Sequence, residues 1–159
     1  MPAIVGFGAA IAIALDCMSD EAARLRRLRD RLIEGVAPMD GAHLNGHPVE
    51  RLPGNVNVSF EGADSESILL ALDLQGVAAS SGSACTSGSL EPSHVLSAIH
   101  LRPEVAAGTV RLTLGRWNTD EEIDDLRVVL PDVVGSLRAA AAGRPPRAAL
   151  SRPAQSSAR

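Results

Sequence analysis

Two six-residue segments in which polar and apolar side chains alternate strictly set the framework of this 159-residue chain. The first covers residues 55–60 and the second covers residues 109–114. A period of two is typical of β-strands with one face in a core, because successive side chains point to opposite faces of a sheet. The second segment therefore places Val110 and Leu112 on the inner face and Arg111 on the opposite face.

A long helical pattern precedes the first alternating segment. Apolar residues recur with helical spacing up to residue 36, which predicts one helix over residues 6–36, or two pieces with Ser19 as the N-cap of the second. Residues 4–15 lack the basic flank and the cleavage site of a secretion signal, and they are too short to span a bilayer. We therefore expect a buried helix there, with Cys17 packed along it.

Further elements follow from capping and turn residues. Asp64 can cap a short helix, and residues 76–79 are compatible with a short strand. Pro92 suits the first turn of a helix to about residue 100. The sequence Thr119-Asp120-Glu121-Glu122 is a capping box that opens a long helix to about Ala142.

Two remaining segments have no clear helical or strand period. Residues 41–54 contain Asn-Gly and Pro-Gly pairs and predict a loop or a short hairpin. Residues 143–159 are rich in Arg, Pro and Ser and predict a disordered tail. The fold class is therefore α+β: one domain over residues 1–142, with a small antiparallel or mixed sheet covered by helices, followed by the tail.

Composition excludes several classes of function. The net charge is −4, and no basic cluster is interleaved with aromatic residues, which argues against a nucleic-acid partner. All 15 basic residues are arginines, so the chain has no lysine with which to hold pyridoxal phosphate as a Schiff base. The arginines between residues 24 and 31 are offset by nearby acidic residues and predict a solvated helix face; these acidic residues are Asp20, Glu21, Asp30 and Glu34. His43 and His47 are separated by a turn sequence, and no metal site is expected there.

Cysteine usage indicates the compartment and one candidate site. The chain has two cysteines, no CxxC pair and no secretory signature, which predicts a reducing cytoplasm and no membrane association. Cys85 lies among glycines and serines in residues 80–92, a composition typical of a loop that presents its side chain. On composition alone, a structural thiol and a reactive thiol both stay open.

Several motifs, in order along the chain, are similar to the C-terminal part of cysteine desulfurases of the long-loop type, in the class V aminotransferase group. The similarity extends from about residue 2 to about residue 140. The motifs that carry it are Leu-Pro-Gly-Asn-Val-Asn-Val-Ser-Phe at 52–60, Ser-Ser-Gly-Ser-Ala-Cys-Thr-Ser at 80–87, Leu-Glu-Pro-Ser at 90–93 and Val-Arg-Leu-Thr-Leu-Gly-Arg at 110–116.

This resemblance implies the small domain of a pyridoxal phosphate enzyme of fold type I. It implies that Cys85 is the catalytic nucleophile, which takes sulfur from L-cysteine as a persulfide and leaves L-alanine, for iron–sulfur cluster assembly or thiolation. It also implies that Arg111 binds the substrate carboxylate, that the complete enzyme is a homodimer, and that a sulfur acceptor or scaffold protein is a partner. No residue of the chain matches the family's cofactor-binding groups, because the large domain that carries them is missing.

Three interpretations remain open. The chain is a desulfurase small domain that acts with a separate large domain, a non-catalytic module that binds the sulfur acceptor or scaffold, or a decayed fragment. Alone it is expected to be inactive.

Overall fold

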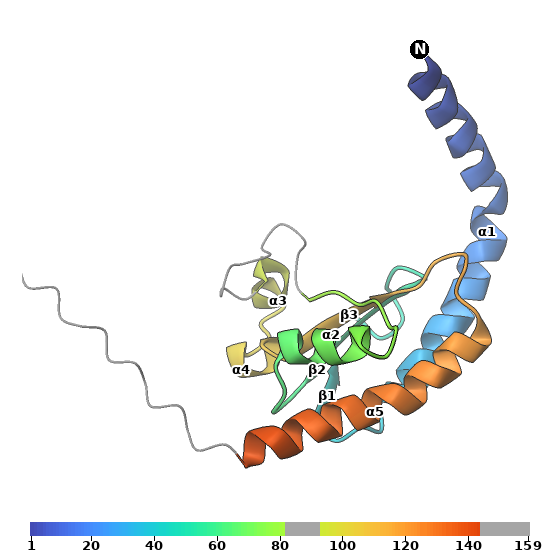
Figure 1. The fold of residues 1–159 in the computed structure, drawn as a ribbon. Helices are drawn as coiled ribbons and strands as arrows, with labels where there is room; N and C mark the ends of the chain where they lie inside the picture. Colours follow the sequence, from blue (N-terminus) through green and yellow to red (C-terminus); the bar gives the residue numbers. More distant parts are fainter. Residues whose placement is uncertain (82–92, 144–159) are drawn as a thin grey trace, which may run out of the picture.

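The computed structural model describes residues 1–81 and 93–143, and it confirms an α+β fold (Figure 1). The segment that holds Cys85 and the predicted tail from residue 144 onward lie outside the described residues. In chain order the elements are α1 (Pro2–Val36), β1 (Ala42–Leu44), β2 (Asn55–Phe60), α2 (Ser65–Asp73), α3 (His94–Ala98), α4 (Pro103–Ala106), β3 (Thr109–Thr113) and α5 (Asp120–Ala142).

The three strands form one antiparallel sheet in the order β1-β2-β3. Both alternating segments are strands, as predicted, and the segment expected to be a loop or short hairpin contributes β1. In the register of β2 and β3, Val58 faces Val110 and Asn57 faces Arg111. Because the side-chain period is two, this register gives the sheet one apolar face and one polar face.

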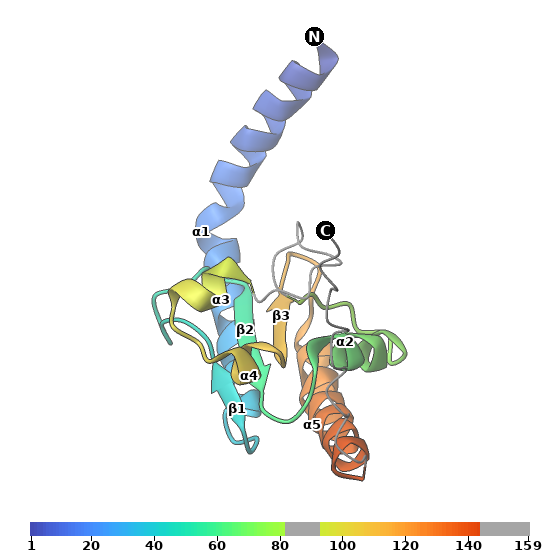
Figure 2. The same cartoon turned by 90° about the vertical axis from the view of Figure 1, so that its left-hand side faces the viewer.

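Helices α1, α2 and α5 supply the core on the apolar face of the sheet, whereas α3 and α4 lie on its other side (Figure 2). Burial of apolar surface is the main force that holds these layers together. The fully buried apolar residues, none with more than 2% exposure, are Leu28, Leu32, Val56, Val58, Phe60, Ile68, Leu72, Val110, Ile123, Leu130 and Val134.

Helix α1 differs from the prediction in two ways. It is one continuous helix without a break at Ser19, and its N-terminal half projects away from the rest of the domain (Figures 1 and 2). The prediction of a buried helix was wrong: Phe7 is 69% exposed, and Cys17 is also exposed. The physical reason is geometric, because the sheet and α5 reach only the C-terminal half of α1.

Helix α1 is also long and apolar enough to cross a membrane by length and composition. Core helices of soluble proteins and signal sequences pass the same test. In the described residues, however, none of the apolar window of α1 is buried against the domain.

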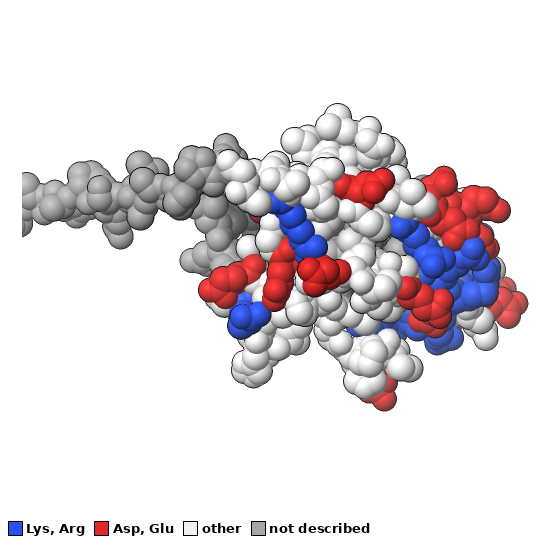
Figure 3. All heavy atoms as spheres, turned by 90° about the horizontal axis from the view of Figure 1, so that it is seen from below, with Lys and Arg blue, Asp and Glu red and all other residues white. Residues whose placement is uncertain are grey.

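Ion pairs join the C-terminal half of α1 to the start of α5. Arg27 and Arg31 both bond to Asp120, and Arg31 also bonds to Asp124. Acidic and basic side chains are interleaved on the surface where these helices meet (Figure 3). The prediction of a solvated arginine face was therefore wrong in part, and Arg29 is only 3% exposed. Opposite charges on α5, which is far away in the sequence, turn this face of α1 into an interhelical contact.

Replacing Asp120 with asparagine is expected to lower the stability of the fold at neutral pH and to matter less in acid. The hydrogen bond from Arg27 lowers the pKa of Asp120 from its ordinary value of 3.8, against a smaller opposing effect of desolvation, and the charges of Arg27 and Arg31 act in the same direction as the bond. A carboxylate with a lowered folded pKa stabilises the fold above its unfolded pKa, and this contribution disappears as the pH falls through the folded pKa.

Urea unfolding of the parent and of Asp120→Asn at pH 7 and at pH 3 measures this difference. Glu121→Gln is a matched control in the same helical turn, because no described ion pair involves Glu121. A difference between parent and Asp120→Asn that is independent of pH would contradict the role of the ion pairs.

The predicted caps are present, one predicted strand is absent, and one predicted helix is shorter than expected. Asp64 accepts a hydrogen bond from the Ser67 amide at 2.9 Å, and Thr119 and Glu122 form the capping box of α5. The strand expected at residues 76–79 is absent, since only Ser80 makes an isolated bridge. The helix expected over 92–100 is the five-residue α3.

Candidate functional site

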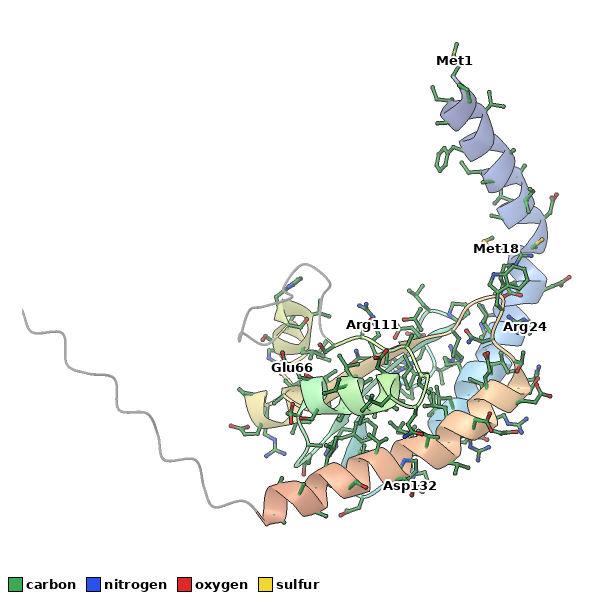
Figure 4. The ribbon with its side chains drawn as sticks, viewed as in Figure 1. Met1, Met18, Arg24, Glu66, Arg111 and Asp132 are labelled. Carbon is green, nitrogen blue, oxygen red and sulfur yellow. The ribbon has the colours of Figure 1, made fainter. Side chains whose placement is uncertain are left out.

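Arg111 lies in the middle of β3 and projects from the face of the sheet opposite α5 (Figure 4). The alternation of the strand predicts this orientation. On the free edge of β3, Ser80 pairs with Arg111: its amide donates to the Arg111 carbonyl at 3.1 Å, and the Arg111 amide donates to the Ser80 carbonyl at 2.6 Å. Ser80 is five residues before Cys85 in the sequence. The chain therefore enters the Cys85 segment from a point fixed beside Arg111.

A recess of about 280 Å³ lies beside Arg111 on this polar face. Asn45, Asn55 and Asn57 line it from the strands and the turn after β1. Val95 of α3 and Ile99, the residue directly after α3, line it from the other side. The recess thus combines one guanidinium group and three carboxamide groups with an apolar wall, a composition suited to a small polar ligand that carries a negative charge.

A buried hydrogen-bond network supports the floor of this recess. The Asn45 Nδ2 atom donates to Asn57 Oδ1 and to Ser59 Oγ, both at 2.7 Å. Ser59 Oγ lies 2.6 Å from Thr109 Oγ1, and both hydroxyl side chains are fully buried. Sequence reasoning missed this network. The signal was present, since the alternation places Asn57 and Ser59 on the same face as Arg111 once β2 and β3 are paired.

Cys17 and Arg116 lie together at a different place, beside the exposed part of α1. Both line an apolar recess of about 630 Å³ between α1 and the turn before β2. The Arg116 guanidinium also lies 5.1 Å from the centroid of the Trp117 ring. Neither residue borders the recess at Arg111, so the structure separates Cys17 and Arg116 from the candidate site.

Comparison with known proteins assigns the family. The sequence profile described as Aminotransferase class-V matches residues 1–126. The chain belongs to the class V aminotransferase family. Among curated relatives of this class V chain, "Cysteine desulfurase IscS 1" of Archaeoglobus fulgidus is 56% identical over 138 residues, which are 87% of this chain and 36% of that protein. "Cysteine desulfurase IscS" of Methanosarcina thermophila is 49% identical over 138 residues, 87% of this chain and 34% of that protein.

A solved structure agrees with this assignment. The structure of a "NIFS-LIKE PROTEIN" superposes on this class V chain with a TM-score of 0.74 and 28% identity, covering 86% of this chain and 34% of that one. The chain therefore spans about a third of the length of the relatives that it matches. The small sheet with its flanking helices is a part of their fold that forms the same arrangement here.

Class V aminotransferases depend on pyridoxal phosphate, and the residues of this chain do not fit that cofactor. Proteins hold pyridoxal phosphate through a lysine Schiff base, and none of the 159 residues is a lysine. Arginine cannot replace it, because its guanidinium stays protonated. Residues 1–81 and 93–143 also contain no cluster of His, Cys, Asp or Glu that could hold a metal ion.

Proposed function

We propose that this chain is the C-terminal, sulfur-carrying part of a cysteine desulfurase. The observation that carries the proposal is the pairing of Ser80 with Arg111, which brings the chain to within five residues of Cys85 on the strand that bears the proposed substrate anchor. The names of the two curated relatives, both cysteine desulfurases, support the same reaction.

In this proposal Cys85 is the nucleophile and Arg111 is the substrate anchor. The Cys85 thiolate attacks the sulfur of L-cysteine, an S–S bond forms, and the bond between that sulfur and Cβ breaks. The electron pair of the broken bond stays on the carbon, which gains a proton and becomes the methyl group of L-alanine. The products are L-alanine and a persulfide on Cys85, so the exchange needs no external oxidant or reductant. The planar guanidinium of Arg111 suits two-point binding of the carboxylate.

The pyridoxal phosphate of the family would be held by residues outside these 159. The exposed apolar half of α1 supports this arrangement, because a continuous exposed surface of large apolar side chains is typical of a contact with another protein. The large side chains of this surface, each at least 59% exposed, are Ile4, Val5, Phe7, Ile13, Leu15 and Met18. A sulfur-acceptor or iron–sulfur scaffold protein, a homodimeric complete enzyme and a cytoplasmic location are parts of the same proposal.

The test is reconstitution with a large domain. The 159-residue chain is mixed with pyridoxal phosphate and with the lysine-bearing remainder of the Archaeoglobus fulgidus relative, and alanine released from L-cysteine is quantified. We expect alanine, and sulfide when dithiothreitol is added to reduce the persulfide, only when both polypeptides are present, because the thiol and the lysine are on different chains.

Three outcomes would contradict the proposal. Alanine release by the 159-residue chain alone would show that the missing lysine is not needed. No release from the mixture, despite co-purification of the two polypeptides, would favour a non-catalytic module that binds the acceptor or scaffold. No co-purification and no release would favour a decayed fragment.

A further inference from the structure

We propose that Asn57 is a second ligand of the substrate carboxylate beside Arg111, and that Asn45 is the positioning residue that aims the Asn57 amide. This inference rests on the proposed function, since it concerns the substrate of the same recess. It adds a specificity determinant to that recess, namely a neutral hydrogen-bond donor next to the cation.

The sheet places the three side chains in one row. The backbone amide of Asn45 donates to the backbone carbonyl of Asn57 at 2.9 Å, and Asn57 faces Arg111 in the register of β2 and β3. Residues directly opposite each other in an antiparallel pair have Cβ atoms only about 5 Å apart. Asn57 is therefore the central member of the row, between Asn45 and Arg111, and all three line the same recess.

The hydrogen bonds determine which end of the Asn57 amide faces Arg111. Asn57 Oδ1 accepts the bond from Asn45 Nδ2 and so points toward Asn45. The Asn57 NH₂ group is the other end of this planar amide and takes no part in that bond, and in the proposal it faces β3 and Arg111, the residue paired with Asn57 in the sheet. An Asn amide has two N–H donors, and this orientation presents them to the recess and not to the sheet interior.

The side-chain amide of Asn45 is itself held in place. Asn45 is only 8% exposed, and its Nδ2 atom donates its two hydrogens to Asn57 Oδ1 and Ser59 Oγ. Ser59 is anchored in turn by Thr109. Because a buried donor without a partner costs free energy, this arrangement resists a flip of the Asn45 amide. The network thus keeps the Asn57 donors toward the position beside Arg111.

A carboxylate fits the resulting donor set. Its two oxygens can accept bonds from the guanidinium of Arg111 and from the Asn57 NH₂ group, and hydrogen bonds to charged groups are the stronger kind. The wall formed by α3 and the residue after it offers Val95 and Ile99 to an uncharged portion of the ligand. An acidic residue at position 57 would instead place a like charge beside the carboxylate.

Binding is tested directly on the 159-residue chain, without turnover. L-Cysteine is titrated under reducing conditions while the side-chain resonances of Asn57 and Arg111 are followed by NMR. Cysteamine, which lacks the carboxylate, is the control ligand. We expect L-cysteine, and not cysteamine, to shift both sets of resonances.

Asn57→Ser is expected to weaken L-cysteine binding about tenfold, the loss typical of one hydrogen bond to a charged group. Asn57→Asp is expected to abolish detectable binding.

Matched variants separate this inference from the proposed function. Thr113→Ala changes an exposed position on the same strand outside the recess and is expected to bind L-cysteine as the parent does. Asn45→Ala is expected to shift the Asn57 side-chain amide resonances before any ligand is added and to weaken L-cysteine binding, whereas shifted resonances with unchanged binding would refute the role of Asn45 as a positioning residue. Circular dichroism confirms that each variant is folded.

The outcomes are distinguishable. If Arg111→Ala weakens binding while both Asn57 variants bind as the parent does, the role of Asn57 is refuted and the proposed function stands. If Arg111→Ala has no effect, or if the parent shows no binding of L-cysteine, both the inference and the substrate role of Arg111 are overturned.

Discussion

Replacing Cys85 with serine is expected to abolish alanine and sulfide release by the reconstituted pair of polypeptides. A hydroxyl group has a far higher pKa than a thiol and cannot form the persulfide that carries sulfur away. The pairing of Ser80 with Arg111 starts the Cys85 segment beside the proposed substrate anchor. The measurement is the initial rate of alanine release from L-cysteine, together with mass spectrometry for a persulfide on the chain.

The matched control is Cys17→Ser. Cys17 lies on α1 and borders a different recess. Its replacement with serine is therefore expected to leave the rate of alanine release nearly unchanged. Arg111→Ala is expected to raise the KM for L-cysteine by roughly 30-fold or more, because losing a charged hydrogen-bonding partner typically costs about 2 to 3 kcal/mol. Equal losses of rate in Cys85→Ser and Cys17→Ser would refute the assignment of the nucleophile.

Replacing Phe60 with alanine is expected to have the largest effect on stability, about 3 to 5 kcal/mol less free energy of unfolding. Phe60 is the largest fully buried side chain, at the end of the central strand β2, and its removal would leave a cavity in the core formed by α1, α2, α5 and the sheet. Such a loss is a large part of the stability of a domain of this size. Urea unfolding followed by circular dichroism measures it.

Phe7→Ala is the matched control, because it makes the same change at the other phenylalanine of the chain. Phe7 is 69% exposed on the projecting half of α1, so its removal creates no cavity, and a change of less than about 0.5 kcal/mol is expected. A loss at Phe7 as large as that at Phe60 would show that the N-terminal half of α1 is buried in solution, by self-association or otherwise.

The elements of this fold that depend on local patterns were predictable from the sequence. The strands β2 and β3, the N-cap at Asp64 and the capping box at Thr119 follow from side-chain period and local hydrogen-bonding chemistry, both of which act over a few residues. The orientation of Arg111 away from the core follows from the same period. These features need no knowledge of what packs against them.

Features that depend on distant partners were not predictable in this way. The apolar residues 4–15 read as a buried helix, but burial requires an opposing surface, and the described residues place none there. The face of α1 that carries Arg27 and Arg31 pairs with Asp120 and Asp124, about ninety residues later in the sequence.

The candidate site likewise has features that the sequence determines and features that only the tertiary structure decides. The sequence by itself determined the strand alternation, the outward direction of Arg111 and the absence of a lysine for pyridoxal phosphate. Only the tertiary structure decided that Ser80 pairs with Arg111 and that Asn45, Asn57 and Arg111 form one row. The physical reason is that strand register and edge pairing are set by contacts between segments far apart in the chain, and a one-residue shift of one strand would move all of that strand's side chains to the other face.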